Sequence, residues 1–449
     1  MYVEDTIAAI ATPPGCGGIG VVRLSGPASE QIASRVFRRT NPGRWKTHRL
    51  YIGIVLDSQG KPLDEALGVV MRGPRSYTGE DVFEIHCHGS PVVLRQALAA
   101  VLHFGARPAV AGEFTKRAFL NGRMDLTQAE AVIDLIRART AEGAGHVADQ
   151  LFGHLSEHLD DLRQQLARVK GVLEVQIDFS EEEVDFDPGA TANLIRVVLE
   201  RIDALRRTYD RGRLLRDGIQ VAITGRPNAG KSSLLNALLG TDRAIVTPVP
   251  GTTRDVIEEA IDFDGVPVVL RDTAGLREAP DEVERIGVER ARAVARTADL
   301  VLHVIDGSLS ASISADEILC TNTIIVINKV DLPRALSPDS LGAFARHPIV
   351  EISAREGVGL DALRQASLAG FAQAPPDGLP ILGSARQFHA LAKISEFLRS
   401  AVGGLEQGTP VDLVSVDVQA ALEHIASITG ALTNEDVLEV IFREFCIGK

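Results

Sequence analysis

The fold of the central part of the chain can be predicted from one short segment, Gly225-Arg226-Pro227-Asn228-Ala229-Gly230-Lys231-Ser232-Ser233. It has the spacing G-x-x-x-x-G-K-[ST] and stands between the apolar run Val221-Ala222-Ile223 and an apolar helical pattern. Glycines here let backbone N–H groups surround phosphate oxygens, while Lys231 reaches the β- and γ-phosphates and the Ser232 hydroxyl ligates magnesium. A glycine-rich turn formed by chance is the alternative, but the strand before it and the helix after it are what a phosphate-binding loop requires.

Three more short motifs follow apolar runs farther along the chain. An Asp after a strand, followed by Gly, can hold magnesium through water and sense the γ-phosphate. The Asp331 carboxylate can accept the N–H donors of a guanine edge, which adenine does not present, and a backbone amide near Ala354 can reach the guanine carbonyl. The motifs are Asp272-Thr273-Ala274-Gly275, Asn328-Lys329-Val330-Asp331 and Ser353-Ala354-Arg355. In this order they resemble the guanine-nucleotide-binding GTPases.

The residue after Asp-x-x-Gly is Leu276, where signalling GTPases place a Gln that orients the attacking water. A leucine side chain cannot orient water, so another nearby group must do so, and the candidates are Arg277, Glu282 and Glu284.

The second unusual residue is Asn228 in the phosphate loop. Its oxygen, with those of the segment 247–253, can hold a monovalent cation beside the phosphates, or Asn228 can simply cap the loop.

Composition limits the class of protein. The length of 449 residues indicates about three domains, and a composition of 45% hydrophobic and 24% charged residues is typical of globular proteins. The net charge of −13 argues against a general nucleic-acid coat protein. The four cysteines form no Cys-x-x-Cys pair, so no zinc ribbon or disulfide framework is indicated. We find neither a signal peptide nor an apolar run of roughly 18 residues, so we expect a cytoplasmic protein with no membrane span.

Changes in hydrophobic period divide the chain. Strand patterns mark the first 122 residues, with clean alternation over 82–88, whereas helical spacing begins at Met124. Three apolar helical patterns predict packed helices. They are a stripe of apolar residues from Leu151 to Leu173, a helix beginning near Thr191 whose apolar face includes Leu194, and a C-terminal apolar face that includes Val437, Val440 and Ile441.

Strand and helix signals alternate from 217 to 373, with strands expected at 266–271, 300–305, 323–328 and 348–352, which is typical of a doubly wound sheet. We predict an α+β multidomain protein with a β-rich N-terminal domain, an all-α helical domain and an α/β P-loop GTPase domain. The expected limits are 1–122, 123–213 for the first helical part, 214–377 for the GTPase and 378–449 for the second helical part.

Blocks of sequence throughout the chain resemble one family, that of the tRNA uridine-5-carboxymethylaminomethyl modification GTPases, called MnmE or TrmE. The blocks are the head Asp5 to Gly15, Tyr77-Thr78-Gly79-Glu80-Asp81, Pro108 to Arg117, Leu120 to Leu126, the GTPase motifs and the tail Phe445-Cys446-Ile447-Gly448-Lys449. The resemblance implies that the GTPase domain is inserted into the helical domain, and that the N-terminal domain binds a formyl-tetrahydrofolate and forms a homodimer. The head departs from the family at Cys16, where the family usually has Arg, which puts any role of that arginine in doubt.

The resemblance also implies the site residues. Arg23, Glu84, Arg123 and Lys449 match the folate-binding places, although without the resemblance Arg23 and Glu84 would be read as ordinary surface charges. Ser232 and Thr253 match magnesium ligands, and Asn228, Thr247, Val249 and Thr252 match a potassium site. Glu284 matches the residue that positions the hydrolytic water, and Cys446 matches a tail cysteine whose role stays open between a reactive thiol and a small hydrophobe.

The implied reaction is potassium-activated GTP hydrolysis coupled to wobble-uridine modification of tRNA. The folate, as 5-formyl- or methylene-tetrahydrofolate, would donate the carbon unit, and a flavoprotein partner (MnmG, also called GidA) would carry FAD. Two rivals remain: an RNA-binding assembly switch without chemistry, which folate binding would exclude, and a folate enzyme with an inactive GTPase, which GTP turnover would exclude. Two dense basic runs, residues 35–49 and 201–216, are either tRNA contacts or solvated faces.

Overall fold

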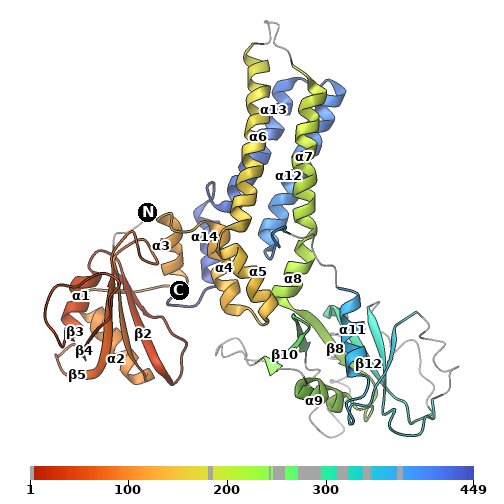
Figure 1. Ribbon diagram of the computed structural model, residues 1–449, viewed down its shortest axis with the longest axis horizontal. Helices are drawn as coiled ribbons and strands as arrows, with labels where there is room; N and C mark the ends of the chain where they lie inside the picture. Colours follow the sequence, from red (N-terminus) through yellow and green to blue (C-terminus); the bar gives the residue numbers. More distant parts are fainter. Residues whose placement is uncertain are drawn as a thin grey trace.

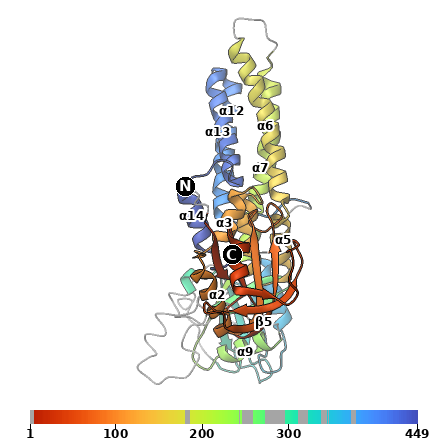
Figure 2. The same cartoon turned by 90° about the vertical axis from the view of Figure 1, so that its left-hand side faces the viewer.

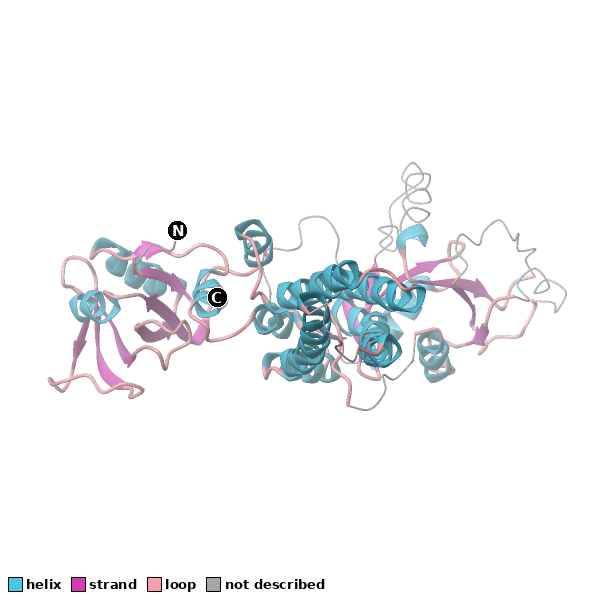
Figure 3. Ribbon diagram, turned by 90° about the horizontal axis from the view of Figure 1, so that it is seen from above, coloured by secondary structure: helices cyan, strands magenta, loops and turns pink. Residues whose placement is uncertain are grey.

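The computed structural model describes residues 5–179, 186–241, 244–245, 258–271, 295–310, 322–336, 344, 346–371 and 378–449. They form three lobes: an N-terminal sheet domain, a tall bundle of helices and an α/β unit at the foot of the bundle (Figure 1). Seen from above, the sheet domain and the α/β unit lie at opposite ends, with the helices between them (Figure 3). The predicted fold class is confirmed.

The N-terminal domain is built on a seven-stranded sheet in the order β3-β4-β5-β6-β2-β1-β7. The alternation predicted for 82–88 is confirmed in β6, where Phe83, Ile85 and Cys87 are buried in the core while Glu84 and His86 are partly open on the other face. The elements are β1 (Ile7–Ile10), β2 (Gly17–Ser25), α1 (Ser29–Val36), β3 (Phe37–Arg39), β4 (Tyr51–Leu56), β5 (Pro62–Met71), β6 (Val82–Gly89), α2 (Pro91–His103), β7 (Arg107–Pro108) and α3 (Glu113–Leu120).

Four long helices form the bundle that rises above the sheet domain (Figure 2). They are α6 (His154–Asp178), α7 (Pro188–Arg207), α12 (Ala385–Gln407) and α13 (Val411–Thr429), and their apolar faces make one continuous core. Shorter helices lie at its base, namely α4 (Leu126–Arg137), α5 (Ala141–Leu151), α8 (Tyr209–Asp217) and α14 (Glu435–Arg443). The Asp125 carboxylate accepts from the Gln128 backbone while the Gln128 side chain accepts from the Asp125 backbone, which fixes where α4 begins.

Three details of the helical prediction were wrong. The stripe is not one helix from Leu151, because Gly153 adopts a left-handed φ of +98° and separates α5 from α6. In α7 Leu194 is exposed and Ile195 is buried, because Thr191 and Ala192 belong to the packed face and shift it by one residue. In α14 Val440 is exposed, since Leu438 and Phe442 pack against α4 instead.

The α/β unit has a seven-stranded sheet in the order β14-β13-β12-β8-β11-β10-β9, parallel from β14 to β11. Strands β11 and β13 match the predicted ranges. The elements are β8 (Ile219–Thr224), α9 (Lys231–Thr241), β9 (Ala244–Ile245), β10 (Glu258–Phe263), β11 (Val266–Arg271), β12 (Leu300–Asp306), β13 (Thr323–Asn328), β14 (Ile349–Glu351) and α11 (Leu360–Ala369). The carboxyl ends of the parallel strands meet at one edge, where ligands bind in open α/β sheets.

The chain enters the α/β unit through α8 and returns beside it. A Cβ added to Gly212 of α8 would lie 1.9 Å from the Leu382 carbonyl oxygen, and the Leu382 backbone N–H donates to the Thr208 hydroxyl at 3.1 Å. The α/β unit is therefore inserted between two parts of the helical domain. The predicted boundary after residue 213 falls inside α8, and the domain limits stay a prediction. Among the described residues, no helix has the length and apolar character that crossing a membrane requires.

Candidate functional site

The phosphate loop joins β8 to α9 at the carboxyl edge of the sheet. Gly225 has a φ of +135°, and a Cβ there would lie 2.2 Å from the Val304 carbonyl oxygen of β12. Gly230 has a φ of +97°, and its Cβ would lie 2.1 Å from the Asn328 side-chain nitrogen. Only glycine fits either place, because the loop passes so close to β12 and β13.

Lys231 bends back over this loop. Its Nζ donates to the carbonyl oxygens of Gly225 at 2.9 Å and Arg226 at 2.8 Å. Burial lowers the pKa of Lys231 because desolvation disfavours the charged amine. A phosphate would supply the negative charge that these neutral carbonyls lack. Ser232 and Ser233 follow in the first turn of α9 and are exposed.

Asn328 connects the phosphate loop to the loop after β14. Its Nδ2 donates to the Ala229 carbonyl oxygen at 3.0 Å, and its Oδ1 accepts from the Ala354 backbone N–H at 3.0 Å. The side chain is buried, so both hydrogen bonds are shielded from water. Asn328 therefore positions two loops that the sequence separates by more than a hundred residues.

Asp331 is held by the third motif. The Ser353 hydroxyl donates to Asp331 Oδ1 at 2.6 Å, and this hydrogen bond lowers the pKa of Asp331. The carboxylate thus stays ionised and able to accept N–H donors from a base. Arg355 is largely exposed, and its Nε lies 3.7 Å from a Glu356 carboxylate oxygen.

Sequence reasoning missed Asp306. Lys329 Nζ donates to Asp306 Oδ2 at 2.5 Å and to the Asn228 carbonyl oxygen at 3.0 Å, so the Lys329 ammonium joins the end of β12 to the phosphate loop. Burial would raise the pKa of Asp306, but hydrogen bonds from Lys329 and Ser308 outweigh it and lower the pKa. The available signal was position, because Asp306 ends β12 just as Asp272 follows β11.

Several predicted residues lie outside the described residues: Thr247, Val249, Thr252, Thr253, Asp272, Thr273, Ala274, Gly275 and Glu284. Their roles stay predictions. Within the described ranges no three His, Cys, Asp or Glu side chains gather around a common point. The predicted ion ligands are instead hydroxyl, amide and carbonyl oxygens, and the exposed Ser232 hydroxyl and Asn228 fit that donor set at the mouth of the phosphate loop.

A second cluster lies in the N-terminal domain, where β2 and β6 run side by side. Arg23 Nε donates to Glu84 Oε1 at 2.8 Å, and the guanidinium lies over the rings of Tyr77 at 5.3 Å and Phe114 at 5.6 Å. His86 Nε2 approaches the other Glu84 oxygen at 3.0 Å. Burial would raise the pKa of Glu84, but His86 and Arg23 outweigh it and lower the pKa.

The C-terminal tail reaches this cluster. Arg23 donates to the Gly448 carbonyl oxygen at 3.4 Å, and the Phe114 backbone N–H donates to the Lys449 carbonyl oxygen at 3.2 Å. Figure 1 places the C terminus beside α3. Burial and the nearby Arg23 lower the pKa of Lys449. The structure thus brings together Arg23, Glu84 and Lys449 from three distant parts of the chain.

Two other predicted residues lie at the border of this cluster. Arg123 Nε donates to the Ser76 carbonyl oxygen at 3.0 Å, so Arg123 contacts the loop that carries Tyr77. Cys446 is exposed, and its carbonyl oxygen accepts from the Gly112 backbone N–H at 3.4 Å. Tyr77 and Phe114 were within the quoted sequence blocks but were not singled out as site residues.

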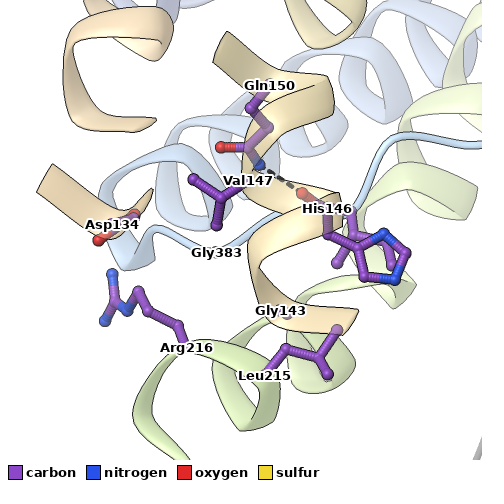
Figure 4. A pocket seen from close by; sticks show the side chains of 10 residues that line it. Asp134, Gly143, His146, Val147, Gln150, Leu215, Arg216 and Gly383 are labelled. Carbon is purple, nitrogen blue, oxygen red and sulfur yellow. Dashed lines mark hydrogen bonds between the residues drawn. The ribbon is translucent and has the colours of Figure 1, made fainter. Parts of the chain in front are cut away.

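A small cavity at the base of the bundle is not a third site for a nucleotide or a folate. The side chains of Asp134 and Arg216 lie near each other at one side of it (Figure 4), and Gln150 Nε2 donates to the carbonyl oxygen of Ile381, which also lines the cavity. Burial raises the pKa of Asp134 to about 6, although Arg216 opposes the rise. The cavity volume is about 20 Å³, which accommodates little more than one water molecule.

Two protein-family profiles match this chain, one over its N-terminal domain and the other over most of the remaining residues. The profile of the MnmE helical domain matches residues 126–446, and that of the GTP-binding protein TrmE N-terminus matches residues 6–123. A solved G domain of the T. maritima FeoB iron transporter is 27% identical, covers 34% of this chain and 99% of its own, and has a TM-score of 0.26.

Full-length relatives are similar along the whole chain. The tRNA modification GTPase MnmE of Roseiflexus sp. (strain RS-1) is 46% identical over 465 residues, covering 100% of both chains. That of Geobacter sulfurreducens is 46% identical over 461 residues, again covering 100% of both. That of Natranaerobius thermophilus is 43% identical over 456 residues and covers 99% of this chain and 100% of its own. Since a family profile spans most of the sequence and the relatives match it from end to end, the chain belongs to the MnmE family of tRNA modification GTPases.

Proposed function

We propose that this protein hydrolyses GTP to GDP and phosphate in the service of tRNA modification. In the full proposal it acts in the cytoplasm as a homodimer with a flavoprotein partner that carries FAD. Together they add a carboxymethylaminomethyl or aminomethyl group to carbon five of the wobble uridine, using a tetrahydrofolate one-carbon unit. The names of the full-length relatives support the tRNA and GTPase parts. The resemblance of the head and tail supports the folate, partner and homodimer parts.

The observation that carries the GTPase part is the double hydrogen bond of Asn328. It holds the phosphate loop at Ala229 and the loop at Ala354 at one fixed spacing. A nucleotide has its phosphates at one end and its base at the other, so a site that fixes both loops is preorganised for one ligand of that length. Asp331 would accept the guanine N–H donors, and Lys231 would exchange its carbonyl partners for phosphate oxygens.

Ions complete this proposal. Magnesium held by Ser232 and Thr253, and potassium held by Asn228, Thr247, Val249 and Thr252, would neutralise charge on the phosphates. Glu284 would position the attacking water, which Leu276 cannot do. The protein groups themselves would bind the phosphates through the loop amides and Lys231, and Asp331 would select guanine over adenine.

The N-terminal cluster would hold the folate. Glu84 offers a carboxylate for the N–H groups of a pterin edge, while Arg23, Arg123 and Lys449 offer cations for the glutamate tail. Tyr77 and Phe114 add ring faces beside Arg23, against which a flat pterin can pack.

The GTPase proposal is tested by turnover in potassium and in sodium at equal ionic strength. We expect faster GTP hydrolysis in potassium, and we expect Glu284→Ala to abolish turnover while nucleotide binding persists. Glu282→Ala is the matched control, because it removes a neighbouring carboxylate of the same length. Equal rates in the two salts would exclude potassium activation, and full activity of Glu284→Ala would exclude its assigned role.

The tRNA part is tested by nucleoside analysis of tRNA from cells that lack this chain. We expect the modified wobble uridine to disappear and to return when the wild-type chain is supplied. An unchanged nucleoside pattern would end the tRNA assignment while leaving GTP hydrolysis intact.

A further inference from the structure

The two basic runs of the sequence have different surroundings in the fold. In the second run, guanidinium groups pair with carboxylates: Arg201 with Asp161 at 2.7 Å, Arg206 with Asp203 at 3.2 Å, Arg211 with Glu142 at 2.5 Å, Arg213 with Asp299 at 3.4 Å and Arg216 with Asp217 at 2.9 Å. These charges are already neutralised within the helical domain and its border. The second run is therefore mainly structural.

The first run lacks such partners. Residues 31–56 contain no Asp or Glu, although the whole chain has a net charge of −13. Of its basic residues, Arg35, Arg38, Arg44, Lys46 and Arg49 are exposed, and we call these five side chains the basic surface. None of the five forms an ion pair with a described residue. Glu65 of β5 shares a row of the sheet with Arg38, but it stands two strands away, roughly 10 Å.

The loop that carries three of these side chains is fixed to the sheet. Arg72 donates to the Trp45 carbonyl oxygen at 3.2 Å and to Glu30 at 2.6 Å, and the His48 backbone N–H donates to the Val70 carbonyl oxygen at 2.8 Å. His48 adopts a left-handed φ of +59°, which a residue with a side chain keeps only where its surroundings impose it. The positions of Arg44, Lys46 and Arg49 are thus set by the fold.

Arg39 stiffens the same surface from beneath. Its guanidinium lies 3.8 Å from the Tyr51 ring centre and 4.8 Å from that of Trp45, and it donates to the Gly43 carbonyl oxygen at 2.6 Å. The surface also lies at the outer end of the N-terminal domain, at the β3 and β4 edge, away from the bundle and the α/β unit (Figure 1). A large ligand can reach it without meeting the other lobes.

We propose that the basic surface binds the phosphate backbone of tRNA, an inference that rests on the proposed function. Four of its five side chains are arginines, whose planar guanidinium groups match phosphate oxygens in pairs. Phosphate contacts of this kind position a nucleic acid without reading its sequence. Direct tRNA contact by an acidic protein is possible because the five charges are gathered on one surface and form no ion pair with a described residue.

Binding of a tRNA transcript to the full-length chain, measured at several potassium chloride concentrations, tests the proposal. The variant Arg44→Ala/Lys46→Ala/Arg49→Ala removes three charges from the loop. We expect affinity at low salt to fall about tenfold or more, and the slope of log K against log salt to shrink by about 2 to 3, since each phosphate contact contributes about 0.7–0.9. GTP turnover without tRNA should match that of the wild type.

A charge-matched control uses three exposed residues of the helical domain, Arg163→Ala/Lys393→Ala/Arg443→Ala, each of which takes part in a local helical ion pair. It should leave both affinity and slope unchanged. Equal affinities for the loop variant and this control would overturn the proposal, as would a wild-type chain that does not bind the transcript. If the loop variant still binds tRNA but no longer binds polyglutamate, the surface is instead a binding site for an acidic protein. A loop variant that changes only the oligomeric state would assign it to a second copy of this chain.

Nucleoside analysis of tRNA from deletion and complemented cells distinguishes a failure of this inference from a failure of the proposed function. If deletion of the chain leaves tRNA nucleosides unchanged, the proposed function fails. If deletion removes the modification and the loop variant restores it fully at wild-type abundance, the docking surface alone is wrong.

Discussion

The two candidate sites of this protein are assembled in opposite ways. In the phosphate loop Lys231 contacts Gly225 and Arg226, which lie six and five residues before it. In the N-terminal cluster Arg23 contacts Glu84, 61 residues away, and Gly448, 425 residues away. The contacts of Lys231 are local, although Asn328 joins the same loop to the distant loop at Ala354, whereas the second cluster exists only if the tail docks. The first site should therefore tolerate changes elsewhere that abolish the second.

The sites also differ in how their cations are balanced. The partners of Lys231 are neutral carbonyl oxygens, and burial lowers its pKa, so the site favours a highly charged anion. Arg23 is already paired with Glu84, so a ligand there must offer both a donor edge and negative charge. The two proposed ligands, GTP at the first site and a folate at the second, differ in the same way.

The largest expected effect comes from Lys231→Ala. It removes the lysine that is proposed to reach the β- and γ-phosphates from the loop, so GTP turnover should fall about 100-fold or more. Folate binding should be unchanged, because the described residues of the two sites lie in separate lobes of the molecule (Figure 1). Turnover and folate titration on the same preparation measure both, and Lys393→Ala, an exposed lysine of α12, is the control. A Lys231→Ala protein that also lost folate would show that the sites are coupled.

The next effect is that of Arg23→Ala on folate binding. The change leaves the Glu84 carboxylate without its arginine, and a charged hydrogen bond of this kind contributes about 1.5–3 kcal/mol. Folate affinity should fall about 10-fold to 100-fold by titration calorimetry, with GTP turnover intact. Arg72→Ala, which breaks a more exposed pair with Glu30 in the same domain, should leave folate affinity unchanged. Similar losses in both variants would point to general damage to the domain.

Gly448→Ala tests whether tail docking builds the second site. Gly448 has a φ of +101°, and an added Cβ would lie 2.3 Å from the Ile10 carbonyl oxygen. The tail should detach, the Phe114 amide should exchange faster with solvent, and folate affinity should fall up to about tenfold. Gly403→Ala in α12, where an added Cβ meets nothing within 4 Å, is the control. An unchanged Phe114 exchange rate would show that the tail accommodates the methyl group.

The smallest effect concerns pH. The pKa of Glu84 is lowered in the folded protein, so its stabilising contribution is complete above the ordinary glutamate pKa and is lost as pH falls through the lowered value. The wild type should therefore lose more thermal stability than Glu84→Gln between pH 7 and pH 3.5. Melting curves at both pH values measure the difference, with Glu406→Gln, an exposed glutamate of the bundle, as the control. Equal losses in wild type and Glu84→Gln would show that the pair does not stabilise the fold.

Pattern reasoning succeeded where neighbours in sequence are neighbours in space. The strands over 266–271 and 323–328 and the leucine stripe from Leu155 to Leu173 are confirmed, because a buried strand or helix face repeats with its own period. It failed by one residue in α7, where the small Ala192 and the hydroxyl-bearing Thr191 occupy the packed face. A prediction from the spacing of large apolar residues leaves out small or hydroxyl-bearing residues on the buried face. It therefore placed Leu194 on that face in place of Ile195.

The phosphate loop, the guanine-type motifs and the helical and strand-rich segments could all be predicted from the amino-acid sequence, since each depends on spacing within a few residues. The packing of the folded chain was needed to show that Asn328 joins two loops, that Asp306 holds Lys329, and that the tail contacts Arg23. It also showed that Arg201, Arg211 and Arg213 of the second basic run pair with carboxylates from other elements, whereas the five exposed side chains of the first run form no ion pair with a described residue. Contacts between distant segments depend on how whole elements pack, and a linear pattern carries no measure of that.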